Sequence, residues 1–192
     1  MTPEEVMKIL EKSEAVLDGH FLLSSGLHSD RYVQCALATR DPKDGARLGA
    51  GIAELFKSDP PTLVVGPALG GVIIAYEVAR ALGVPNIFAE RVDGVMTIRR
   101  GFKVSASDRV VIVEDVFTTG KSTMEVAEVV KQSGATITGF GSIVDRTGGA
   151  SKLPMPPRSL IALKFNTYQA GECPLCKSGS TPIKPGSRPK PA

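Results

Sequence analysis

The segment that most constrains how this chain folds runs from Val110 to Thr123 and reads VVIVEDVFTTGKST. Its first four residues are β-branched and apolar, which predicts a strand buried on both faces. Two carboxylates follow at Glu114 and Asp115, and a loop of small and hydroxyl residues occupies Thr118 to Ser122. Apolar residues then recur at helical spacing up to Val130. The segment therefore predicts strand, loop and helix, with ligand chemistry at the carboxyl end of the strand.

The loop suits an anion bound beside the start of the helix. Residues 118–122 offer backbone N–H groups, hydroxyls and Lys121, and the helix dipole favours negative charge there. Glu114 and Asp115 would repel a phosphate, but carboxylates accept hydrogen bonds and suit ribose hydroxyls or the shell of a Mg²⁺ ion. Together these residues predict a grip for a ribose 5-phosphate group.

The segment suggests two other interpretations. In the first, Ser122 and Glu125 form a capping box after a core strand, and the acids are surface residues. In the second, GKST ends a P-loop, but that pattern needs a glycine five residues before Gly120, where Asp115 stands. The P-loop interpretation therefore fails.

The segment resembles the signature of type I phosphoribosyltransferases that binds phosphoribosyl pyrophosphate (PRPP): an apolar strand, two acids, two variable residues and Thr-x-Gly-x-Ser/Thr. The resemblance implies an α/β fold with a mainly parallel central sheet and helices on both faces. It also implies that Glu114 and Asp115 are catalytic and that the whole stretch binds PRPP, namely Glu114, Asp115, Val116, Phe117, Thr118, Thr119, Gly120, Lys121 and Ser122.

Composition narrows the class of protein. The net charge of +3 lies entirely in residues 171–192, so the rest of the chain is neutral and offers no basic footprint for nucleic acid. No apolar run approaches the length of a membrane span, and the N-terminus has no signal-peptide pattern, so we expect no membrane association. Three cysteines, an odd count, argue against a disulfide framework and favour a cytoplasmic location.

The N-terminal region narrows the family. Thr2 and Pro3 begin a helix whose apolar face extends to Leu17, and we expect Gly19 to end it. Residues 19–34 then predict two short strands around a Ser-Ser-Gly turn. This stretch resembles the N-terminal hood that covers the base in orotate phosphoribosyltransferases. Ser24 stands where better-known members carry a lysine that helps to bind PRPP, and the paired aromatics that contact orotate are matched only by Tyr32.

A second loop follows the buried strand at residues 63–65. The sequence GPALGG, Gly66 to Gly71, leads into a helix that we expect over residues 72–82. Glycines at such a turn let a ligand approach the backbone closely, although packing of a tight turn also requires glycine. The resemblance implies that Leu69, Gly70 and Gly71 bind PRPP at its pyrophosphate, with Gly70 where many members carry a lysine.

A cationic hairpin is predicted over residues 91–102, with Asp93 and Gly94 as its turn. In the resembling family this region is a mobile basic loop that closes over the pyrophosphate of a neighbouring subunit. Arg91, which the resemblance marks as catalytic, is therefore a candidate clamp together with Arg99 and Arg100. The alternative is a solvated cationic hairpin.

Arg146 follows another predicted strand, residues 137–144, so it should lie near the ribose loop. An arginine pairs with a carboxylate through two parallel hydrogen bonds, and orotate is the pyrimidine base that bears one. The resemblance implies that Arg146 and Thr118 bind orotate. The alternative is a surface ion pair between Arg146 and Asp145.

The C-terminal tail contains Cys173-Pro-Leu-Cys176, which is half of a zinc site. His20 and His28 are far away in the sequence, so structural zinc and plain thiols both remain open. Residues 177–192 are rich in Pro, Gly, Ser and Lys, which is typical of disorder.

These patterns predict one phosphoribosyltransferase domain over residues 1–170, with a hood at about 1–40 and a core at about 60–165, and a CxxC-containing, disordered tail at 171–192. The resemblance implies transfer of ribose 5-phosphate from PRPP to orotate in pyrimidine biosynthesis. It further implies Mg²⁺ bound mainly through PRPP rather than by a protein site, and a homodimer with shared active sites. A phosphoribosyltransferase for another base and a non-catalytic PRPP sensor remain as alternatives.

Overall fold

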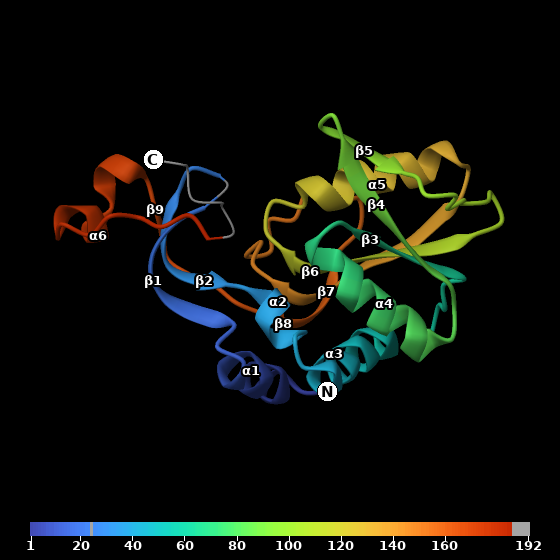
Figure 1. The fold of residues 1–192 in the computed structure, drawn as a ribbon, viewed down its shortest axis with the longest axis horizontal. Helices are drawn as coiled ribbons and strands as arrows, with labels where there is room; N and C mark the ends of the chain where they lie inside the picture. Colours follow the sequence, from blue (N-terminus) through green and yellow to red (C-terminus); the bar gives the residue numbers. More distant parts are fainter. Residues whose placement is uncertain (24, 186–192) are drawn as a thin grey trace.

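The computed structural model describes residues 1–23 and 25–185 and contains two sheets (Figure 1). The six-stranded central sheet has the order β5-β4-β3-β6-β7-β8 and the smaller sheet has the order β1-β2-β9. The elements in chain order are α1 (Pro3–Lys12), β1 (Val16–Leu22), β2 (His28–Val33), α2 (Cys35–Ala38), α3 (Pro42–Glu54), β3 (Leu63–Pro67), α4 (Gly70–Leu82), β4 (Asn86–Val92), β5 (Val95–Ile98), β6 (Arg109–Phe117), α5 (Lys121–Gln132), β7 (Thr136–Asp145), β8 (Arg158–Ala162), β9 (Thr167–Tyr168), η1 (Ala170–Glu172) and α6 (Pro174–Lys177).

All neighbours in the central sheet pair in parallel except β4 and β5, which form an antiparallel hairpin. From β3 the chain builds outward to β4 and β5, then returns to place β6 on the other side of β3. The order of strands thus reverses between β3 and β6. In open α/β sheets such a reversal opens a crevice at the carboxyl ends of the strands, where ligands bind.

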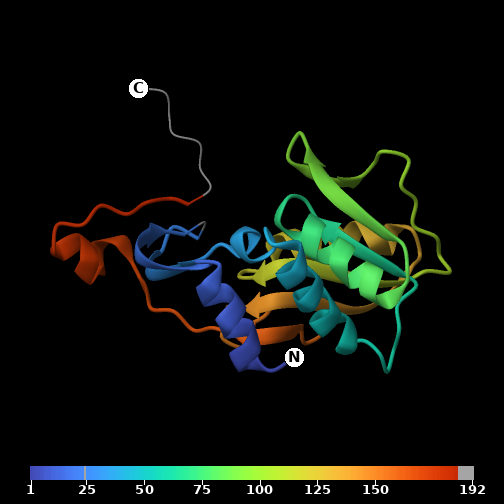
Figure 2. The ribbon, with the colours of Figure 1, turned by 60° about the horizontal axis from the view of Figure 1, so that its bottom comes forward.

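Helices cover both faces of the central sheet, as the sequence predicts. Figure 2 shows α3 and α4 together on one face, and α5 packs on the other. Side chains alternate along β6, so Val111 and Val113 join the core under α3 and α4 while Val110 and Ile112 join the core under α5. Burial on both faces explains why this strand is a continuous β-branched run.

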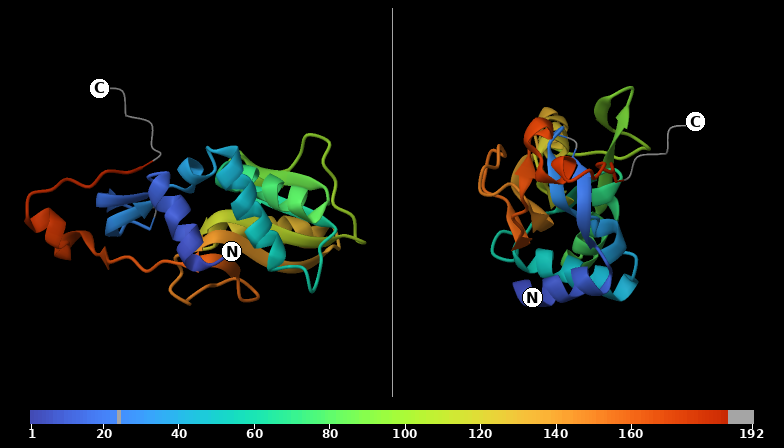
Figure 3. Two further views of the ribbon diagram at one scale, coloured as in Figure 1. Left: turned by 90° about the horizontal axis from the view of Figure 1, so that it is seen from below. Right: turned by 90° about the vertical axis from the view of Figure 1, so that its left-hand side faces the viewer.

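The smaller sheet, here called the hood, lies at one end of the molecule (Figure 3). The antiparallel pair β1–β2 forms most of it, as expected, and β9 joins β2 through Tyr168 and Thr167. The sequence does not predict β9, because two residues are too short to carry a strand pattern.

The C-terminal segment differs from the disordered tail that its composition predicts. Residues 170–177 form η1 and α6, and Ile183 pairs with Phe21 beside β1. Two backbone hydrogen bonds fix that pairing: Ile183 N donates to His20 O and Leu22 N donates to Ile183 O, each at 2.8 Å. The structure thus describes the C-terminal segment as far as residue 185, and residues 186–192 lie outside the described part of the chain.

Two predicted helix boundaries are wrong. Helix α1 ends at Lys12, not at Gly19, because Glu14 takes a left-handed conformation (φ 55°) and Val16 begins β1. Helix α5 has no capping box at Ser122, because the left-handed Gly120 (φ 72°) is its N-cap and no side chain caps it. Helix α3 follows the N-cap residue Asp41, whose side chain accepts a hydrogen bond from Lys43 N.

Within the described residues, no helix combines the length and the apolar character needed to cross a membrane.

Candidate active site

The site lies at the carboxyl ends of β3 and β6, where the order of strands reverses. A cavity of about 240 Å³ opens there, bounded by Glu114 and Val116 of β6 and by residues 118–123 of the following loop and helix. The loop residues Thr118, Thr119 and Lys121 are exposed. The structure thus brings Glu114, Val116 and the loop residues 118–122 together around one hollow, while Asp115 and Phe117 are not among its lining residues.

The start of α5 faces this hollow. Its N-cap residue, Gly120, has no side chain that could accept hydrogen bonds from the first N–H groups of the helix. Gly120 turns the chain into the helix through a positive φ that most residues avoid. The first-turn N–H groups of a helix lack partners inside it, and together with the dipole they favour an anion. This end of the cavity suits a phosphate group.

Glu114 lines the same cavity, and its neighbour Asp115 lies next to it in β6. Burial, together with the neighbouring negative charge of Asp115, raises the pKa of Glu114 well above its ordinary value. Burial also raises the pKa of Asp115, although hydrogen bonds to its carboxylate, including one from Val116 N at 2.8 Å, oppose that rise. Because burial destabilises the ionised form of both carboxyls, a ligand that brings positive charge or hydroxyl donors would favour their ionisation.

The glycine loop before α4 packs directly against these acids. A Cβ built on Gly70 would lie 2.9 Å from both carboxylate oxygens of Asp115, and one on Gly71 would lie 3.2 Å from Oε1 of Glu114. A side chain at Gly70 would displace the Asp115 carboxylate, whereas one at Gly71 would first meet Cδ of Pro67 at 2.8 Å and the carbonyl oxygen of Val113 at 2.9 Å. The Ala68–Leu69 peptide bond in this loop is cis, and Leu69 is 88% exposed.

A larger cavity of about 460 Å³ adjoins the first one and shares Val116, Thr118 and Thr119 with it. The hood contributes one wall, and the C-terminal segment contributes part of another. Its lining residues are Leu22, Leu23, Ser25, Leu27, Tyr32, Val33, Val116, Thr118, Thr119, Arg146, Thr167, Lys184 and Pro185. The lining is mainly apolar with a few polar groups, as is common for small-molecule sites.

Arg146 is the cationic group from the core that reaches this larger cavity. Its backbone N–H donates to Phe117 O at 2.8 Å, which fixes it beside the end of β6. Its guanidinium carbon lies 4.4 Å from the centre of the Phe165 ring, and its buried Nε has no hydrogen-bond partner in the described part of the chain. Burial lowers the pKa of Arg146. Arg146 thus brings a planar cation to the lining of the cavity and keeps one buried donor without a partner among the described residues.

Three lining residues were missed by the sequence analysis: Thr167, Lys184 and Pro185. Thr167 reaches the cavity through the pairing of β9 with β2, and Lys184 and Pro185 follow Ile183, which pairs with Phe21 of β1. No local pattern marks them, because a Pro- and Gly-rich segment looks the same whether or not it docks.

Six predicted site residues are not among those that line either cavity: Leu69, Gly70, Gly71, Arg91, Asp115 and Phe117. Arg91 donates to Gly94 O at 3.1 Å and pairs with Glu125 of α5, so within its own chain it lies away from the hollow. The Phe117 side chain is 1% exposed and packs in the core under α5, which leaves only its backbone for a ligand. Ser24, the lysine position of better-known relatives, lies outside the described residues.

Comparison with known proteins gives consistent matches. A family model described as "Phosphoribosyl transferase domain" matches residues 42–170. The orotate phosphoribosyltransferase of Pelotomaculum thermopropionicum is 48% identical over 98% of this chain and 99% of its own length, and that of Caldanaerobacter subterraneus is 50% identical with the same coverage. A crystal structure of orotate phosphoribosyltransferase from Aeropyrum pernix superposes with a TM-score of 0.71 at 30% identity, covering 82% of this chain and 93% of that one.

Proposed function

This chain belongs to the orotate phosphoribosyltransferase family, and from that premise we propose how its residues carry out the transfer. The reaction joins orotate and PRPP to give orotidine 5′-monophosphate and pyrophosphate, a step of pyrimidine biosynthesis. The bond from C1′ to the base nitrogen forms as the bond from C1′ to the pyrophosphate oxygen breaks.

PRPP occupies the smaller cavity in this proposal. Its 5′-phosphate binds at the uncapped start of α5, where residues 118–122 supply backbone N–H groups and hydroxyls. Its ribose hydroxyls face Glu114 and Asp115, and its pyrophosphate lies along residues 69–71. The close packing of Gly70 against Asp115 supports this placement, because it keeps the pyrophosphate loop in contact with the ribose acids.

Orotate occupies the larger cavity, and the observation that carries the assignment is Arg146. Arg146 is half-buried, and its buried Nε has no hydrogen-bond partner among the described residues, so its guanidinium is a strong site for a planar carboxylate. Thr118 lines both cavities, so it can contact the base where the base meets the ribose. A phosphoribosyltransferase for an uncharged base would have no need of this arginine.

Catalysis then rests on position and charge. The two cavities share a wall, so the base nitrogen and C1′ are held next to each other, which removes most of the entropic cost of their meeting. Positive charge develops at the ribosyl centre as pyrophosphate departs, and the carboxylate of Asp115 stabilises it. The apolar hood residues exclude water, which would otherwise compete with orotate.

Mg²⁺ is proposed to arrive with PRPP. Among the described residues, the acids at the site do not gather into a group of three metal ligands, which fits an ion carried mainly by the substrate's own oxygens and water. Bound there, it would supply positive charge against the pyrophosphate. The negative charge of Glu114 and Asp115 would attract the cation to this end of the cavity.

A homodimer with shared sites is proposed from two surface features. Leu69, Ile73 and Tyr76 form an exposed apolar stripe at the start of α4, with 88%, 51% and 57% exposure. This stripe adjoins Gly70, so a partner packed on it would lie next to the site. Arg91 and its hairpin, which do not reach the cavities of their own chain, would then serve the partner's pyrophosphate loop.

A cytoplasmic location is proposed from the cysteines. All three are free thiols in the structure, and Cys35 and Cys173 are buried. Free thiols persist in a reducing compartment.

The function is tested by identifying both products. Incubation with PRPP, Mg²⁺ and orotate should give orotidine 5′-monophosphate and pyrophosphate in equal amounts, separated by ion-exchange chromatography. The Asp115→Asn variant should fold normally and lose most turnover, because it removes charge beside the ribosyl centre. Wild-type protein that forms neither product would contradict the proposal.

A further inference from the structure

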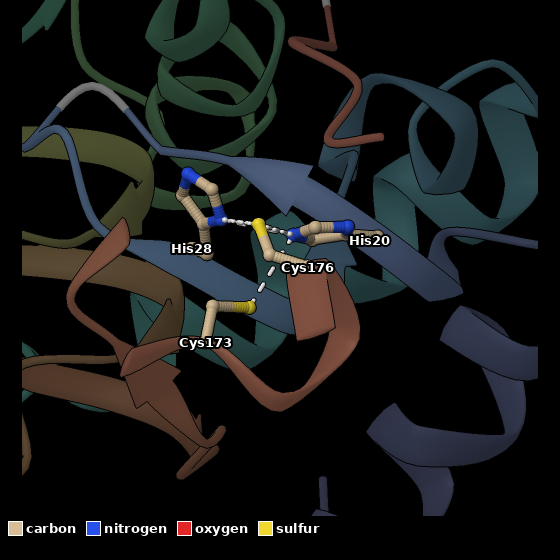
Figure 4. A group of neighbouring side chains, drawn as sticks. All are labelled: His20, His28, Cys173 and Cys176. Atoms are coloured by element: carbon tan, nitrogen blue, oxygen red, sulfur yellow. Dashed lines mark hydrogen bonds between the residues drawn. The ribbon is translucent and has the colours of Figure 1, made fainter. Parts of the chain in front are cut away.

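Four potential metal ligands from distant parts of the chain meet in the hood: His20 of β1, His28 of β2, Cys173 and Cys176 (Figure 4). Their ligand atoms all lie within 4.8 Å of one another. Cys173 is fully buried and both histidines are 6% exposed. The cluster lies outside both cavities and takes no part in the reaction described above.

Three of the distances between these atoms match the edges of a small tetrahedron. Sγ of Cys173 lies 3.4 Å from Nε2 of His20, and Sγ of Cys176 lies 3.8 Å from the same nitrogen and 3.3 Å from Nδ1 of His28. Zinc bonds of about 2.3 Å to sulfur and about 2.0–2.1 Å to nitrogen require edges of about 3.3–3.8 Å in tetrahedral geometry. The two nitrogens, 2.9 Å apart, are slightly closer than that. An ion at the centre would bring the ligand atoms to these tetrahedral distances.

We propose that His20, His28, Cys173 and Cys176 bind a structural zinc ion. Two thiolates and two imidazoles favour zinc among the common divalent ions, and four protein ligands close the site to water or substrate. The outer nitrogen of His20 is already held, since Nδ1 lies 3.1 Å from Oγ of Ser180. Such a contact orients a metal-bound imidazole. Binding releases the two thiol protons to solvent, so the ion and its ligands form a neutral centre.

An irregularity in the pairing of β1 with β2 helps to bring His20 and His28 together. The β1–β2 register shifts between Asp18 and Phe21, so His20 and Phe21 are both buried although they are neighbours in a strand. Neighbouring side chains of a regular strand point to opposite faces. Phe21 packs against Tyr32, and its ring centre lies 5.7 Å from the Tyr32 ring centre, while His20 turns to the C-terminal segment.

The proposed ion would fasten the C-terminal segment to the hood. After Cys176 the chain returns along β1, where Ile183 pairs with Phe21, and then reaches the orotate cavity at Lys184 and Pro185. The segment is otherwise held mainly by short contacts, because its helices span only three and four residues. Zinc therefore supplies the anchor that a small apolar core cannot supply, and it holds one wall of the cavity in place.

Metal content tests the proposal directly. Full-length protein purified without chelators should contain about one zinc per chain by plasma mass spectrometry. The Cys173→Ser/Cys176→Ser variant should contain almost none. Cys35→Ala is the matched control, because Cys35 is a buried thiol in the main core and should leave the zinc content unchanged. Equal zinc in the double variant and the wild type would overturn the proposal.

Cobalt substitution keeps the test decisive even if the double variant fails to fold. Reduced wild-type protein, stripped of metal and given Co²⁺, should show the absorption of a tetrahedral ion with thiolate ligands. Stripping should also lower the melting temperature by several degrees, and zinc alone should restore it. Failure of the reduced wild type to bind either ion would refute the assignment. So would a Cys173–Cys176 disulfide that persists when the protein is kept under reducing conditions.

Discussion

At the scale of single residues, Arg146 decides which base the proposed site accepts. It enters the larger cavity from the end of β7, its Nε is buried without a partner, and Phe165 supports its guanidinium face. Orotate differs from uracil by one carboxylate, so selection requires a cation or strong donors directed at that group.

Truncating Arg146 should therefore weaken orotate binding selectively. Arg146→Ala should cost about 2–5 kcal/mol in orotate binding, because the carboxylate loses a buried charged partner. Arg146→Lys should restore only part of it, since a point charge cannot reproduce the fork of two hydrogen bonds. Calorimetric titration should find PRPP affinity nearly unchanged in both variants. An equal loss for both ligands would mark Arg146 as a structural residue instead.

The acid pair should make the ligand-free protein sensitive to pH. Burial and the charge of Asp115 raise the pKa of Glu114, so the unfolded chain releases this proton at lower pH than the folded protein does. Stability is therefore lost as pH rises from the ordinary carboxyl value through the raised one. Glu114→Gln removes that loss. Its melting temperature should exceed that of the wild type by a few degrees above the raised pKa, and the gain should vanish below the ordinary pKa.

The exposed Glu128→Gln is the matched control for that experiment, because Glu128 lies on the outer side of α5 and pairs with Lys131. It should change the melting temperature little at any pH. A gain for Glu114→Gln that did not depend on pH would contradict the titration argument.

The residues of the site divide by how far their positions depend on local sequence. Glu114, Asp115 and the loop at 118–122 follow a strand directly, so their spacing alone predicts that they meet at the edge of the sheet. Lys184 and Thr167 reach the cavity through tertiary pairing of short segments, which no local pattern encodes. The contact of Arg91 with Glu125 is equally tertiary.

At the scale of elements, long apolar runs were predictable and short connecting elements were not. The strands β3 and β6 are buried on both faces, so their composition identifies them. The end of α1 was misplaced because Val16 and Leu17 continue the helical spacing although Glu14 breaks the helix. The hood required β9 and residues 170–185, whose order comes from packing and from the cluster around His20.

The C-terminal segment should matter for orotate more than for PRPP. Deleting residues 181–192 removes Lys184 and Pro185 from the cavity wall and the Ile183 pairing with β1. The KM for orotate should rise by roughly tenfold, equivalent to about 1.4 kcal/mol, with a smaller change in the KM for PRPP. Deleting only residues 186–192 is the control, since it keeps every described contact. Unchanged orotate kinetics in the longer deletion would show that the segment does not contribute to the site.

At the scale of the whole molecule, the proposed dimer brings Arg91 of one subunit to the acids of the other. Arg91→Ala and Asp115→Asn should each abolish most activity alone. Equal mixing through unfolding and refolding should regain about a quarter of wild-type activity, because half of the dimers are mixed and each has one intact site. Mixtures that regain nothing would contradict a site shared in this way.

The central claim is that the protein transfers the ribosyl group to orotate rather than to another base, and one measurement tests it directly. Pyrophosphate release should be followed with PRPP and Mg²⁺ at saturation and with orotate, uracil, adenine or hypoxanthine as the acceptor. We expect rapid release with orotate and a kcat/KM lower by at least roughly thirtyfold with each other base, since about 2–5 kcal/mol rests on a carboxylate that only orotate has. Comparable release with uracil, or faster release with either purine, would contradict the assignment of Arg146 and of the cavity it lines.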